Sequence, residues 1–176
     1  KNVYSKGMFE NVCLAIKVAL DLKIDKKIIQ KTLPLLSFEG RFQYLNKGRI
    51  KNRLLKNEII MIDGAHATAD AKNLAAFLKN IKIPKYGIWA MTKNKEPDLF
   101  IKQLKGVFKK IVIMPIENET NSVSVNKLYR IAVKNKFKAE KSNNFTEALK
   151  KVSSKEKKLI VCFGSLYNCG NILNKN

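Results

Sequence analysis

Apolar residues recur at helical spacing near the start of the chain, at Val12, Ile16, Ala19 and Leu22. This spacing predicts a helix over residues 9–23. Asp25 is a suitable N-cap for a second helix over residues 26–33, and Pro34 would disturb the end of that helix. We therefore expect a short helical segment over residues 1–39, with a junction around residues 37–41.

From residue 40 onward, strand patterns alternate with helical ones. Apolar runs predict strands over residues 42–45, 58–62, 86–91, 110–114, 137–140 and 158–163. Helical patterns follow over residues 69–80, 98–107, 125–135, 145–152 and 166–173, and the basic stretch between the first two strands is expected to be a loop. Such alternation predicts an α/β domain over residues 40–176, with a Rossmann-like, mostly parallel sheet and helices on both faces.

Ligands of parallel sheets bind beyond the carboxyl ends of the strands. Three predicted strands end in polar or glycine-rich segments, at residues 63–66, 91–95 and 164–167. Asp63 could accept hydrogen bonds from a ribose diol, as the acidic residue of dinucleotide folds does. Alternatively, Asp63 is a helix-capping residue beside a polar His66.

Other residues at these strand ends could contact an anion. Arg41 could clamp a phosphate or pair with a surface carboxylate. The Gly164–Ser165 turn could offer backbone N–H groups and a hydroxyl to an anion, or Ser165 could be an ordinary N-cap. Lys93 and Lys95 would contact an anion only if their loop faces the crevice, and are otherwise solvated.

The chain of 176 residues carries 35 Lys plus Arg against 14 Asp plus Glu, a formal net charge of +21. This excess raises the alternative of a basic nucleic-acid-binding module. However, only four of the cations are arginines, the better residue for bidentate contacts to phosphates and bases, and the lysines are spread along the chain. We therefore expect most of the charge to lie on a solvated surface, and no nucleic-acid partner.

Several other classes of protein are not supported by the sequence. No apolar run approaches the roughly 18–20 residues that span a membrane, and no secretion signal is visible. Cys13, Cys162 and Cys169 form no CxxC motif and lie far from the single histidine, so we expect no metal site, reduced thiols and a cytoplasmic location. The P-loop, GxGxxG and GxSxG motifs are absent. Because the chain starts without Met, we expect a fragment or a processed piece.

Four motifs in order resemble the C-terminal part of folylpolyglutamate synthase and dihydrofolate synthase, of the Mur ligase superfamily. They are Gly40–Arg41–Phe42–Gln43, Asp63–Gly64–Ala65–His66, Met91 with Lys93 and Lys95, and Phe163–Gly164–Ser165–Leu166–Tyr167. The helix with Asn11, thirty residues before Arg41, resembles the end of that family's central ATPase domain. The resemblance covers essentially the whole chain.

The resemblance implies an ATP-dependent ligase that adds glutamate to dihydropteroate or folate through an acyl phosphate. It implies that Asn11, Arg41 and Asp63 contact ATP, and that His66 and Ser165 lie near the incoming glutamate. It also implies that residues 1–39 are the helical end of the central ATPase domain and residues 40–176 a Mur-ligase-like C-terminal domain. The P-loop and the Mg²⁺ ligands would then lie in a preceding ATPase part, acting in cis or in trans.

This chain departs from the family pattern at several positions. Ala67–Thr68 stands where the family has Asn-Pro, Lys95–Glu96 where it has Lys-Asp, and Glu39 where a Pro commonly precedes Gly-Arg. Near Asn11 the chain lacks the family's usual His-Gln pair and has Met8–Phe9–Glu10 instead. We expect the chain alone not to ligate glutamate, and an alternative is the remnant of a split ligase gene.

Overall fold

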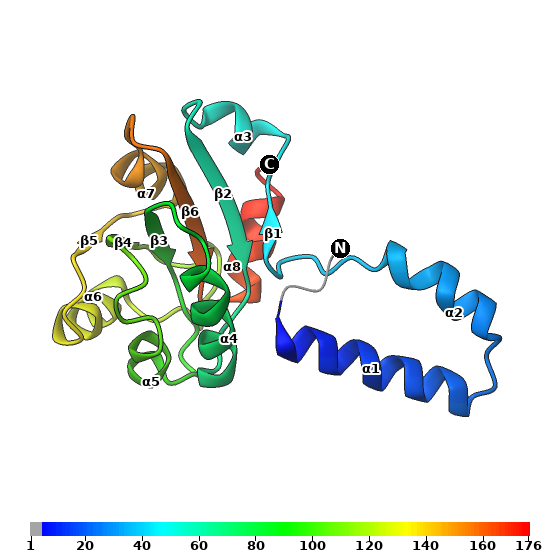
Figure 1. The fold of residues 1–176 in the computed structure, drawn as a ribbon. Coiled ribbons are helices and arrows are strands. Elements are labelled where there is room, and N and C mark those ends of the chain that lie inside the picture. The colour runs from blue at the N-terminus through cyan, green and yellow to red at the C-terminus, as the bar shows by residue number, and fades with distance from the viewer. Residues whose placement is uncertain (1–4) are drawn as a thin grey trace. The chain divides into compact units, whose positions relative to one another are not determined.

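The computed structural model describes residues 5–176, and the chain divides into two compact units, Lys1–Glu39 and Gly40–Asn176 (Figure 1). The first unit consists of α1 (Lys6–Asp21), α2 (Lys26–Thr32) and a 3₁₀ turn (Leu33–Leu35). As predicted, the Asp25 side chain caps α2, accepting the N–H of Lys27 at 2.6 Å. Pro34 lies in the 3₁₀ turn, where the α-helix has already ended.

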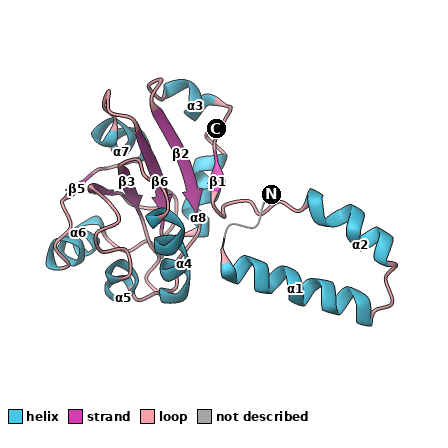
Figure 2. Cartoon of the chain, viewed as in Figure 1, coloured by secondary structure: helices cyan, strands magenta, loops and turns pink. Residues whose placement is uncertain are grey.

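The second unit is an α/β domain, as predicted. Its elements are β1 (Gln43–Tyr44), α3 (Arg49–Arg53), β2 (Glu58–Asp63), α4 (Thr68–Lys79), β3 (Lys85–Trp89), α5 (Pro97–Lys102), β4 (Lys110–Ile113), α6 (Val125–Lys134), β5 (Ala139–Lys141), α7 (Phe145–Val152), β6 (Lys158–Phe163) and α8 (Leu166–Leu173). The strands form one sheet in the order β1-β2-β6-β3-β4-β5 (Figure 1), and Figure 2 draws these strands in magenta between the helices of the unit. Only β1 is antiparallel to its neighbour, and the other pairs are parallel.

Both faces of this sheet are covered, which explains why its central strands are apolar on both sides. Alternate strand residues such as Ile62 and Cys162 pack in one buried cluster with residues of α3, α7 and α8. The opposite face includes Trp89 and Phe163, whose rings stack with Phe100 of α5 at centroid distances of 6.4 and 6.1 Å. Two helical layers therefore hold the sheet rigid and fix the positions of its strand ends.

Several predicted elements have other bounds in the structure, such as the helix predicted over residues 98–107, which ends at Lys102, and two differ more strongly. The strand predicted over residues 42–45 is only two residues long, because β1 pairs with β2 at the positions of Ile62 and Met61 alone. The predicted loop before β2 contains the helix α3. Asn176 caps this helix, since its backbone and side-chain oxygens accept the N–H groups of Arg49 and Ile50 at 2.7 and 3.1 Å.

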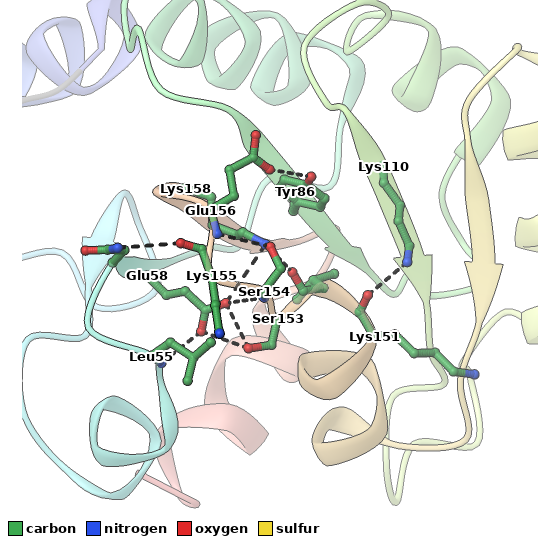
Figure 3. Close-up of polar contacts among 12 residues, drawn as sticks. Leu55, Glu58, Tyr86, Lys110, Lys151, Ser153, Ser154, Lys155, Glu156 and Lys158 are labelled. Carbon is green, nitrogen blue, oxygen red and sulfur yellow. Dashed lines mark hydrogen bonds and ion pairs between the residues drawn. The ribbon is translucent and has the colours of Figure 1, made fainter.

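The amino-terminal edge of the sheet is closed by a buried ionic network (Figure 3). The carboxylate of Glu58 accepts hydrogen bonds from the Ser153 hydroxyl at 2.8 Å and the Ser154 N–H at 2.9 Å. The ammonium of Lys158 lies 4.0 Å from that carboxylate, donates to the Ser154 hydroxyl and sits 4.3 Å above the Tyr86 ring. Both charged side chains are fully buried, and burial lowers the pKa of Lys158.

The described residues, 5–176, contain no helix whose length and apolar character would let it cross a lipid bilayer.

Candidate functional site

Two turns are joined at the carboxyl end of β2. The N–H of Gly64 donates to the carbonyl of Gly40 at 2.6 Å. The Asp63 carboxylate accepts the N–H of Phe42 on one oxygen and that of Ala65 on the other, both at 2.8 Å. These bonds hold the segment around Arg41 against the end of the strand.

The segment that carries Arg41 has an uncommon backbone conformation. Gly40 and Phe42 have φ values of +66° and +45°, in the left-handed region. A residue with a Cβ pays about 1–2 kcal/mol to be there, and the surrounding contacts offset this cost at Phe42. Its ring packs edge-on against Phe77 at 4.7 Å, and the Gln43 side chain accepts the Gly40 N–H at 2.8 Å.

Asp63 is almost fully buried, with 2% of its surface exposed. Burial raises the pKa of its carboxyl, and the hydrogen bonds from Phe42 and Ala65 and the nearby charge of Arg41 oppose that rise. The alternative of a helix-capping Asp63 is wrong, because Asp70 provides the acidic side chain at the start of α4. Asp63 instead caps the two turns.

Arg41 is the cation best placed to receive an anion at this edge. Its guanidinium forms no hydrogen bond or ion pair with any residue between 5 and 176 at the distances that define one. The side chain is only partly exposed, and its charge acts on both Asp63 and the buried thiol of Cys169. An unpaired, partly desolvated guanidinium offers its planar set of donors to a phosphate or carboxylate.

The Gly164–Ser165 turn lies at the carboxyl end of β6. Gly164 has φ +107°, and a Cβ there would lie 2.2 Å from the carbonyl oxygen of Ala90. The buried Ser165 side chain accepts the Asn168 N–H and thus caps α8, which confirms the N-cap interpretation. A Cβ on Gly64 would lie 2.2 Å from the Leu166 side chain, so the end of β2 packs closely against the start of α8.

The remaining predicted residues lie in different surroundings. The Lys93 ammonium donates to the carbonyl of Thr120 at 3.0 Å, and Lys95 is partly exposed. His66 lies beside Gly64 and Asp70, at the start of α4. Asn11 is an exposed residue of α1 and lines an apolar groove within the first unit.

Sequence reasoning missed Asp70, and it named Gln43 in the Gly40–Arg41–Phe42–Gln43 motif without giving that residue a role. Gln43 accepts the N–H of Gly40, and Asp70 accepts the N–H groups of His66 and Ala67 at 3.2 Å each. An acidic residue in the first turn of a predicted helix is a known capping signal, so Asp70 could have been found. The bond of Gln43 depends on the turn conformation, which no local motif showed.

A charged pocket of about 330 Å³ lies at the opposite edge of the sheet. It is lined by Tyr86, Lys109, Lys110, Lys138, Lys151, Val152, Ser153, Ser154 and Lys158. Most of its ammonium groups already have partners. Lys109, Lys110 and Lys151 pair with Glu156, Glu140 and Glu147 at 2.6–2.8 Å. The positive charges of this pocket are therefore largely neutralised by the chain's own carboxylates. No group of three or more His, Cys, Asp or Glu side chains within residues 5–176 is arranged to hold a metal ion.

A family model described as the C-terminal domain of dihydrofolate synthetase matches residues 46–175. Comparison with curated proteins gave no significant match. Among solved structures, the chain is similar to Mycobacterium tuberculosis folylpolyglutamate synthase complexed with ADP and AMPPCP, with a TM-score of 0.82, 18% identity, and coverage of 98% of this chain and 40% of that one.

Two other solved structures share the fold. Folylpolyglutamate synthase from Thermotoga maritima matches with a TM-score of 0.70 and 22% identity, over 96% of this chain and 38% of that one. E. coli FolC in complex with DHPP and ADP matches with a TM-score of 0.75 and 15% identity, over 99% of this chain and 39% of that one. The chain thus spans about two fifths of the length of these structures.

Proposed function

Because the chain belongs to the family of dihydrofolate synthetase C-terminal domains, we propose that it is the C-terminal part of an ATP-dependent ligase. The proposed ligase adds glutamate to dihydropteroate or folate. ATP would phosphorylate the substrate carboxylate, and the amine of glutamate would then attack the acyl phosphate. The solved enzymes of this fold were complexed with nucleotides and, in one case, with DHPP. We propose that this chain acts on ligands of the same two kinds.

The observation that carries this proposal is the unpaired guanidinium of Arg41 at the carboxyl edge of the sheet. In phosphoryl transfer, proteins contribute mainly positioning and the neutralisation of phosphate charge. Arg41 is suited to this work because Asp63 and Gly64 fix the segment that carries it. We propose that Arg41 contacts the ATP phosphates and Asp63 the ribose. With 2% of Asp63 exposed, a ribose contact would use the remaining lone pairs of its two oxygens.

The other residues have weaker proposed roles. Asn11 would contact the adenine, His66 and Ser165 would lie near the incoming glutamate, and Lys93 and Lys95 would add positive charge for anionic substrates. Mg²⁺ would be bound by residues of the ATPase part, outside this chain. In this proposal residues 1–39 are the end of that ATPase domain and residues 40–176 the Mur-ligase-like C-terminal domain.

We further propose that the ATPase part docks on the first unit. Among the described residues of this unit only Met8 is buried, so its two helices have almost no core of their own. They enclose a groove of about 300 Å³ lined almost wholly by apolar side chains, among them Val12, Ile16 and Ile28. The solved ligases match nearly the whole chain but are about two and a half times as long, which favours the rest of such an enzyme as the occupant.

Glutamate addition tests the proposed function. The chain would be assayed for ATP-dependent glutamylation alone and mixed with the ATPase parts of the M. tuberculosis, T. maritima and E. coli enzymes, each without the segment that this chain matches. We expect no product alone and product in at least one mixture, lost in Arg41→Ala but kept in the control Arg53→Ala. If the chain alone forms product, it does not depend on a separate ATPase part. If no mixture forms product, the proposed role as part of a glutamate ligase is wrong.

Docking is tested separately by binding. Ile16→Asp and Ile28→Asp, which place a charge in the groove, should weaken binding to the ATPase part by at least about tenfold. The control Val133→Asp changes an apolar side chain on α6 whose exposure is similar to that of Ile28, and it should have no effect. Circular dichroism would show that the helices of each variant still form. A chain that dimerises through the groove, or a groove variant that binds normally, would refute docking.

A further inference from the structure

His66 is held by two contacts that act on different parts of the residue. Its ring nitrogen Nδ1 lies 2.8 Å from the carbonyl oxygen of Gly64. Its backbone N–H donates to the carboxylate of Asp70 at 3.2 Å, and the same oxygen accepts the N–H of Ala67. Ring and backbone are therefore both fixed at the end of β2.

The contact with Gly64 determines which ring nitrogen carries a proton. A backbone carbonyl oxygen only accepts hydrogen bonds, so Nδ1 must be the donor. When the ring is neutral, Nε2 is then unprotonated and has a lone pair to offer. Within residues 5–176, no group is placed to form a hydrogen bond with Nε2.

Asp70 favours the same arrangement. Its carboxylate oxygen lies 3.8 Å from Nδ1, which is too long for a hydrogen bond but close enough for a negative charge to stabilise the Nδ1 proton. Both side chains are about one-third exposed or less, so solvent screens this interaction only in part. Asp70 also fixes residues 66–67 at the point where this chain lacks the Asn-Pro of the family pattern.

We propose that Gly64 and Asp70 hold His66 as the Nδ1–H tautomer, so that Nε2 accepts a hydrogen bond from the amine of the incoming amino acid. Asp70 is then a positioning residue, which acts on the substrate through His66. The assignment of Nε2 to an amine rests on the proposed function. A neutral Nε2 can accept from an N–H group but cannot donate to a carboxylate, so it suits the amine end of glutamate.

The single histidine makes this proposal testable on the chain itself. Long-range ¹H–¹⁵N NMR of the labelled chain reports the protonation of each ring nitrogen. We expect the neutral ring to carry its proton on Nδ1, whereas free histidine prefers Nε2. A predominant Nε2–H tautomer in the chain would overturn the proposal.

Asp70→Asn keeps an oxygen for the backbone N–H groups but removes the charge. We expect it to lower the ratio of Nδ1–H to Nε2–H by about threefold, within the range of exposed charge pairs. The matched control is Glu147→Gln, which removes an acidic residue from the same capping position of α7 and should leave the ratio unchanged. An unchanged ratio in Asp70→Asn would overturn the positioning role.

The amine assignment is tested by titration with L-glutamate and with glutarate, which has both carboxylates but no amine. L-Glutamate should shift the Nε2 resonance and glutarate should not. Equal shifts, or none with either compound, would overturn the assignment. These NMR measurements need no enzymatic turnover. If Nε2 responds to L-glutamate and not to glutarate but no mixture ligates glutamate, the result counts against the proposed function and not against the role of His66.

Discussion

Asp63 shows how burial and hydrogen bonding compete at a single carboxyl group. Both of its oxygens accept backbone N–H bonds, yet desolvation outweighs those bonds and raises its pKa above the ordinary value of 3.8. The folded chain therefore binds this proton more tightly than the unfolded chain does. Stability contributed by this group increases as the pH falls from the raised pKa towards 3.8.

This direction of the pH dependence predicts how the stability of Asp63→Asn compares with that of the unmodified chain. The amide can accept only one of the two N–H bonds, so the variant should lose about 1–3 kcal/mol of unfolding free energy at neutral pH. Because the variant does not titrate there, that loss should grow as the pH is lowered towards about 4. Urea unfolding of both chains across this range measures the difference.

Glu117 provides a control, because its pKa is shifted in the opposite direction to that of Asp63. Its hydrogen bond from Lys175 lowers its pKa below 4.5, so its stabilising effect is present above that value and is lost as the pH falls through the lowered pKa. The advantage of the unmodified chain over Glu117→Gln should therefore shrink in acid. Parallel trends in the two variants would contradict the assignment of the Asp63 effect to burial.

Gly164 tests how closely the strand ends must approach. Alanine at this position needs φ near +107° and would bring its Cβ to 2.2 Å from the Ala90 carbonyl oxygen, so we expect a loss of about 2–4 kcal/mol. Gly170 is the matched control, because it lies in α8 and its added Cβ would meet no atom within 4 Å apart from neighbouring residues and the backbone of its own helix. Gly170→Ala should stabilise the chain by about 0.5–1 kcal/mol. Thermal and urea unfolding measure both effects, and a tolerated Gly164→Ala would contradict the close approach.

At the scale of elements, the Glu58–Lys158 network joins the starts of β2 and β6 to the end of α7. Removing one charge leaves the other buried without an opposite charge, so Lys158→Met and Glu58→Gln should each cost about 3–5 kcal/mol. The double variant should cost clearly less than the sum of the two. Additive effects in this double-mutant cycle, measured by urea unfolding, would contradict direct coupling of the two side chains.

The elements also show why some structure was readable in the sequence. Helix α7 and strand β6 were predicted with their observed bounds, because Asn144 is a local cap and the strand is a continuous apolar run. Helix α3 was missed because its cap, Asn176, lies 126 residues away in sequence from Ile50. No pattern within the segment contains that contact.

The same distinction applies to the candidate site. The DGAH segment was correctly predicted to follow a buried strand, since strand and turn are local. The bond between Asp63 and the Phe42 N–H spans 21 residues and depends on a left-handed Phe42. Sequence reasoning could therefore propose Asp63 as a ligand-binding residue, but it could not show that both oxygens serve the chain's own backbone.

At the scale of the whole molecule, the two units differ in how much apolar surface they bury. The second unit has a continuous core on both faces of its sheet, whereas large apolar side chains of the first unit, including Phe9, Leu14 and Leu22, are 60–70% exposed. Isolated helices of this length are marginal in water without tertiary packing. The first unit should therefore be much less stable than the second in the chain alone.

Hydrogen exchange followed by mass spectrometry tests this difference. We expect amides of α1 and α2 to exchange at least about a hundredfold faster than those of β3 and β6, because local opening of the helices exposes little buried surface. Binding of the ATPase part should slow exchange in α1 and α2 while leaving α6 unchanged, since only the groove would be covered. Strong protection of both helices in the dilute chain alone would contradict the prediction, and protection that rises with chain concentration would identify a second copy as the occupant of the groove.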